Sequence, residues 1–90
     1  MTIEIPPSDD QFDSLEEHDY GEHIIRIEFY KTSEDLFFVW PYVRVIGGDS
    51  DKMRHFQVRG HFPDKAQARE AALLRGRTLI SSGFDVNSAD

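Results

Sequence analysis

The 90-residue sequence contains no cysteine, which excludes disulfide cross-links, thiol nucleophiles and thiolate metal ligands. It also lacks a long apolar run, since the longest, Leu36 to Tyr42, is interrupted by Pro41. A membrane-spanning helix needs about twenty apolar residues, so we expect none. The N-terminus has neither the basic nor the apolar region of a signal peptide. We therefore expect a single-domain cytoplasmic protein.

Lysine and arginine are absent from the first 22 positions, which hold eight of the 17 acids. The remainder is close to neutral, so most of the net charge of −7 belongs to the N-terminal segment. Such a composition is typical of a solubilising tail. We predict an acidic, mostly disordered tail over 1–19, one folded domain over 20–84 and a short polar tail over 85–90. An alternative is that the acidic tail folds back and screens the basic segment 52–77 in a salt-sensitive way.

Three segments carry the apolar and aromatic patterns of β-strands: 23–31, 36–46 and 52–62. The second is apolar on both faces, as in a central strand, but it contains Pro41. Proline is normally expelled from central strands, so the sequence leaves open whether this strand is continuous, bulged or split at Pro41.

A helix is predicted from Lys65 to about Ser81. Asp64 is a favourable N-cap, and Gly83 is placed to end the helix. Small residues recur along one stripe of this helix and favour a close approach to a sheet: Ala68, Ala72 and Gly76. The predicted fold is therefore α+β, a three-stranded antiparallel β-meander with one C-terminal helix packed on one face (β-β-β-α).

One helix covers only one face of such a sheet. If the second strand keeps its register through Pro41, aromatic and basic residues gather on the opposite face. An exposed patch of this kind indicates a partner. A bulge at Pro41 would flip the register on one side and shrink the patch. The predicted contact surface consists of Tyr30, Phe38, Trp40, Tyr42, Arg44, His55, Arg59 and His61.

These patterns predict a non-enzymatic binding or regulatory module that acts through protein–protein contact. We expect a homodimer, because this is the commonest assembly. A second possibility is that another protein binds to the sheet or to the helix. One alternative is a single-stranded nucleic-acid binder gated by the acidic tail, since aromatics and arginines on an open sheet can hold bases and phosphates. Another is an acidic antitoxin or immunity-type protein.

No motif for catalysis or for cofactor binding is evident. The sequence has no Gly-x-Ser-x-Gly and no phosphate-binding loop. Asp49-Ser50-Asp51 begins like a calcium loop but lacks the remaining ligands. His55 and His61 are too far apart along one strand to share a metal ion. We expect no enzymatic activity, no cofactor and no metal.

A set of aromatic, alanine and glycine positions recurs between Tyr20 and Gly83: Tyr20, the strand Ile24–Phe29, Trp40, Phe62, Ala68-Arg69-Glu70-Ala71, Gly76-Arg77 and Ile80. Through these residues the run from Tyr20 to Gly83 resembles a family of small proteobacterial proteins, and the resemblance implies the fold and no activity. A looser likeness connects the sheet and helix to HicB-type antitoxins, although their glycine-rich segment before the helix is missing here.

Overall fold

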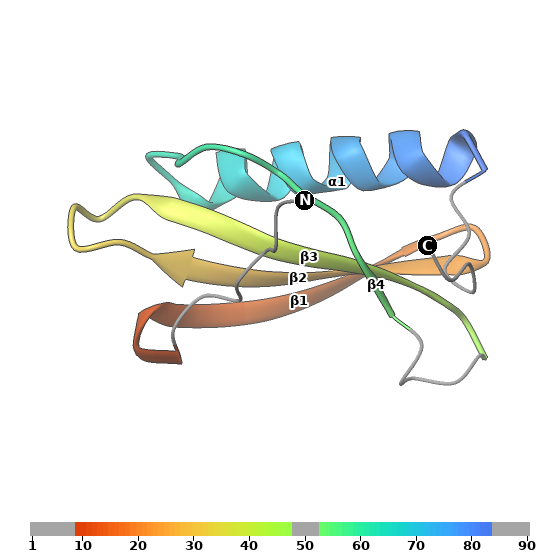
Figure 1. The fold of residues 1–90 in the computed structure, drawn as a ribbon, viewed down its shortest axis with the longest axis horizontal. Coiled ribbons are helices and arrows are strands. Elements are labelled where there is room, and N and C mark those ends of the chain that lie inside the picture. The colour runs from red at the N-terminus through yellow and green to blue at the C-terminus, as the bar shows by residue number, and fades with distance from the viewer. Residues whose placement is uncertain (1–8, 48–52, 84–90) are drawn as a thin grey trace, which may run out of the picture.

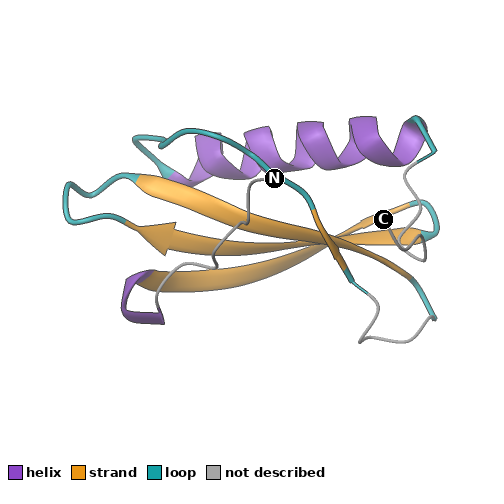
Figure 2. Cartoon of the chain, viewed as in Figure 1, coloured by secondary structure: helices purple, strands orange, loops and turns teal. Residues whose placement is uncertain are grey.

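The computed structural model describes residues 9–47 and 53–83. Four antiparallel strands form one sheet in the order β1-β2-β3-β4, and a single helix lies along one face of it (Figure 1, Figure 2). The α+β prediction, an antiparallel sheet followed by one C-terminal helix, is confirmed. After a short 3₁₀ turn (Asp9–Gln11), the elements are β1 (Phe12–Tyr20), β2 (His23–Lys31), β3 (Phe37–Val45), β4 (Arg54–His55) and α1 (Lys65–Ser81).

The first predicted strand coincides with β2, and the second with β3 apart from one residue at each end. Pro41 lies inside β3 opposite Ile27 of β2, and the pairing stays in register on both sides. The Pro41 carbonyl accepts a hydrogen bond from Phe56 N at 3.2 Å, so its backbone polar groups point away from β2. The missing N–H therefore costs the β2–β3 ladder no hydrogen bond, and β3 is continuous.

The third predicted strand, 52–62, is wrong over most of its described length. β4 pairs only two residues with β3, and contact resumes at an isolated bridge between Phe37 and Phe62. Between these contacts, four residues of β3 face six residues of the segment 56–61. Pro41 has no N–H to donate to the next pair, so the ladder stops and the segment 56–61 bulges away from β3.

Residues 12–19 belong to the predicted, mostly disordered tail, but together with Tyr20 they form the edge strand β1. The sheet therefore begins before residue 20, the predicted start of the domain. A two-residue turn joins β1 to β2, and Gly21 in this turn has a φ of 63°, which favours glycine. Residues 1–8 and 84–90, which include most of the rest of both predicted tails, lie outside the described residues.

Helix α1 begins and ends where predicted. The Asp64 side chain accepts a hydrogen bond from Gln67 N at 2.8 Å, and Gly83 follows the helix with a φ of 93°. The small-residue stripe faces the sheet, and a Cβ added at Gly76 would lie 2.9 Å from Ile25 Cδ1. The buried core between helix and sheet consists of Ile25, Ile27, Phe29, Val39, Val43, Phe56, Ala68 and Ala72.

Candidate binding surface

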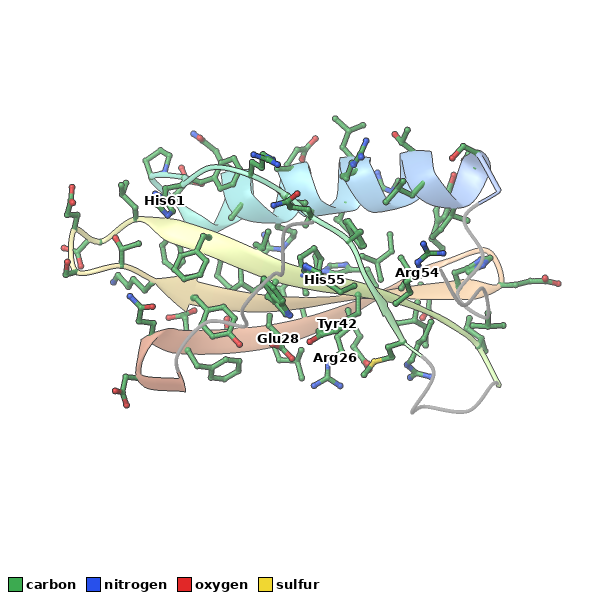
Figure 3. All side chains as sticks on the ribbon, viewed as in Figure 1. Arg26, Glu28, Tyr42, Arg54, His55 and His61 are labelled. Atoms are coloured by element: carbon green, nitrogen blue, oxygen red, sulfur yellow. The ribbon has the colours of Figure 1, made fainter. Side chains whose placement is uncertain are left out.

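The sheet face that points away from α1, called the open face below, is built from four cross-strand rows. Directly paired residues share a face of an antiparallel sheet, so the register fixes each row. Figure 3 shows Arg26, Glu28 and Tyr42 on this side of the sheet. From one end to the other, the rows are Phe12–Tyr30–Phe38, Leu15–Glu28–Trp40, Glu17–Arg26–Tyr42 and Asp19–Ile24–Arg44.

Aromatic rings contact one another along the first row. The Tyr30 ring stacks on Phe38 with the centroids 5.4 Å apart, and Phe12 meets Tyr30 edge-on at 5.7 Å. Pairs in this geometry contribute about 1 kcal/mol beyond the apolar area that they bury. Tyr30 is buried, whereas Phe12 at the edge of the sheet remains 47% exposed. The row of rings therefore extends from the buried Tyr30 on β2 to the accessible Phe12 on the edge strand β1.

Acids on the same face pair both of its arginines. An Arg26 guanidinium nitrogen lies 3.6 Å from a Glu28 carboxylate oxygen, and Arg44 lies 3.7 Å from Glu17. Glu28 also accepts a hydrogen bond from the Tyr30 hydroxyl at 2.8 Å. The open face therefore combines apolar rings with charges that largely cancel.

The structure gathers most of the predicted contact residues. Tyr30, Phe38, Trp40, Tyr42 and Arg44 lie on the open face as expected from an unbroken register. The two histidines join them at the β3 edge: the His55 ring stacks on Trp40 at 3.8 Å, and His61 lies 5.6 Å from Phe38. Arg59 lies in the bulged segment 56–61, is exposed, and lines a pocket together with Phe38, Trp40, His55 and His61.

Sequence reasoning missed the contribution of β1. Leu15 is 43% exposed and lies on the open face opposite Glu28. The alternation of β1 was hidden because the residues that face the helix side, such as Glu16 and His18, are polar. Gly21, flanked by a tyrosine and a β-branched segment, was the available signal for a hairpin.

Glu16 anchors β1 to the helix. Arg69 donates two hydrogen bonds to the Glu16 carboxylate, each at 2.7 Å, and His18 Nε2 lies 2.8 Å from the same group. The hydrogen bonds from Arg69 lower the pKa of Glu16 from 4.5 to about 2; burial opposes this shift, and His18 adds to it. The edge strand β1 is therefore held to α1 by a charged pair, Glu16 and Arg69, whereas β2 and β3 contact α1 through apolar side chains.

Neither a metal site nor a membrane-spanning helix is found in the part of the chain that the structure describes. Within residues 9–47 and 53–83, no three histidine, aspartate or glutamate residues are grouped as metal ligands would be. The helix in these ranges is not long and apolar enough to cross a membrane. The chain matches no family model, no curated protein and no solved structure, so the resemblance of Tyr20 to Gly83 stays a prediction.

Proposed function

We propose that the protein is a non-enzymatic binding module that acts through protein–protein contact, and that the open face joins two copies of the chain. The observation that carries the proposal is the composition of this face. Aromatic and aliphatic side chains cross three strands, and the arginines among them are already paired with glutamates. Burying such a surface removes apolar area from water without leaving those arginines unpaired.

A second copy suits this face better than other partners. The open-face positions of β1–β3 hold three acids and two arginines, so two such faces repel each other far less than the whole-chain net charge of −7 suggests. A two-fold axis would bring each patch against its own copy, as in most homodimers. Single-stranded nucleic acid is the weaker candidate for this face, because Arg26 and Arg44 would have to leave Glu28 and Glu17 to bind phosphates.

Leu15 provides the direct test. Leu15→Glu places a carboxylate on the open face of β1, within the proposed interface, and an unpaired buried charge costs on the order of 3 kcal/mol, which weakens association about 100-fold. Leu74→Glu is the matched control, since Leu74 is 65% exposed on α1, away from the open face. Sedimentation velocity should show that Leu15→Glu is a monomer and that Leu74→Glu sediments like the unmodified dimer. Equal sedimentation of all three proteins would contradict the proposal.

Salt concentration separates self-association from nucleic-acid binding. Two chains of net charge −7 repel each other, and salt screens this repulsion. Self-association should therefore strengthen between low and high salt. Binding through phosphate contacts has the opposite dependence, because it releases counterions. Sedimentation across a salt series measures whether self-association strengthens or weakens with salt. Dissociation of the dimer by added salt would count against an interface made of apolar rings.

A further inference from the structure

The bulge of segment 56–61 opens a pocket of about 280 Å³ at the edge of β3. Four rings line it, from Phe38, Trp40, His55 and His61. Trp40 and His55 are already stacked 3.8 Å apart, so one flat surface is preformed. The volume is slightly below the usual range for small-molecule sites, which begins at about 300 Å³. A ligand of one or two rings fits such a space.

The floor of this pocket includes Val39, although this residue is only 4% exposed and belongs to the core. Its N–H and C=O point to the same side as those of Phe37 and the carbonyl of Pro41, toward the segment 56–61. Among the described residues, no backbone hydrogen bond joins Val39 to that segment. A donor and an acceptor on one β-strand edge are thus presented to a ligand, as the edge of a planar heterocycle requires.

Two arginines lie beside the ring-lined pocket. A neighbouring pocket of about 340 Å³ shares Gln57, Val58 and Arg59 with it and adds Arg75 of α1. Within residues 9–47 and 53–83, neither Arg59 nor Arg75 forms an ion pair with an acid. Two guanidinium groups that line one pocket without a carboxylate favour an anion, and guanidinium groups bind phosphate well.

We propose that this composite site binds a nucleoside monophosphate group, with the base in the ring-lined pocket against the Val39 backbone and the phosphate between Arg59 and Arg75. The rings supply stacking, the strand edge supplies hydrogen bonds to the base, and the arginines supply the charge. This inference does not need the dimer, but the pocket shares Phe38 and Trp40 with the open face. A second copy and a nucleotide would compete for these two rings, so the titration below is run at a concentration at which the chain is a monomer. The nucleotide can be free or the end of a single strand, and the experiment distinguishes these sources.

Titration with adenosine 5′-monophosphate tests the site, with adenosine and inorganic phosphate as partial ligands. Trp40 is the only tryptophan of the chain, so its fluorescence reports on the pocket, and the Val39 amide resonance reports independently on the floor. We expect quenching and a Val39 shift with the monophosphate. Binding should be at least about tenfold weaker with adenosine, because adenosine lacks the phosphate to which the two arginines would donate charge-assisted hydrogen bonds.

Arg75→Gln and Arg77→Gln form a matched pair on the same helix. Both remove one positive charge, but only Arg75 lines the pocket; Arg77 lies over the Tyr20 ring at 5.9 Å. Arg75→Gln should weaken binding about tenfold, while Arg77→Gln leaves it within twofold. A single-stranded adenine tetranucleotide that binds far more tightly than the monophosphate, with the same Arg75 dependence, would identify the source as nucleic acid. Absence of quenching at millimolar monophosphate, or equal loss in both variants, would overturn the proposal.

Discussion

Replacing Gly76 by valine should lower the free energy of unfolding by about 3 kcal/mol. A Cβ at this position already meets Ile25 Cδ1 at 2.9 Å and Phe56 Cζ at 3.1 Å. Valine adds two further carbons in the same direction. Ile25 and Phe56 are buried in the core, where close packing leaves little room for them to move. The helix must then shift away from the sheet, and urea denaturation measures the loss.

Ala66→Val is the control for this substitution, because Ala66 is exposed on the same helix. It changes helix propensity alone and should cost less than about 1 kcal/mol. A similar loss of stability in both variants would show that the close contact between α1 and β2 is not what makes Gly76 sensitive.

Glu16→Gln should lower stability at neutral pH by on the order of 2 kcal/mol once solvent screening of this partly exposed pair is included. Glu16 has a folded-state pKa of about 2 against an ordinary value of 4.5. A carboxyl group whose pKa is lowered by folding stabilises the folded protein at pH values above its ordinary pKa. This stabilisation is lost as the pH falls toward the pKa of the folded state. The unmodified protein should therefore lose this contribution between about pH 5 and pH 2.

The Glu16→Gln variant should lack that part of the pH dependence, so the stabilities of the two proteins converge at about pH 2. Glu70→Gln is the control, since Glu70 is exposed on α1 next to Arg69; it should follow the unmodified protein at every pH. Thermal unfolding at several pH values makes the comparison. A constant difference between Glu16→Gln and the unmodified protein down to pH 2 would contradict the assigned role of the Glu16–Arg69 pair.

Local patterns in the sequence were sufficient for β2, β3 and α1. The alternation of His23–Lys31 matches one buried and one accessible face, and the Asp64 cap places the start of the helix. The sequence did not show that β3 keeps its register through Pro41. This outcome depends on a contact between distant segments, because the Pro41 carbonyl points toward Phe56 and accepts a hydrogen bond from its N–H.

The incorrect predictions for β1 and for the segment 56–61 also arise from contacts between residues far apart in the sequence. β1 has polar residues on its helix side because Glu16 meets Arg69, 53 positions later in the chain, and local hydrophobic periodicity carries no sign of such a pair. The segment 56–61 has the alternation of a strand, but Pro41 in the neighbouring strand interrupts the ladder. Arg75 was not recognised as a candidate site residue, because only the bulge brings Arg59 next to it.

The mass of the unmodified protein in solution shows whether two copies of the chain associate. Light scattering behind size-exclusion chromatography, run at high and low concentration, gives this mass without a label. Self-association through the open face predicts twice the 10.4 kDa of one chain at high concentration, with a shift toward one chain on dilution. A mass of 10.4 kDa at both concentrations would contradict the account.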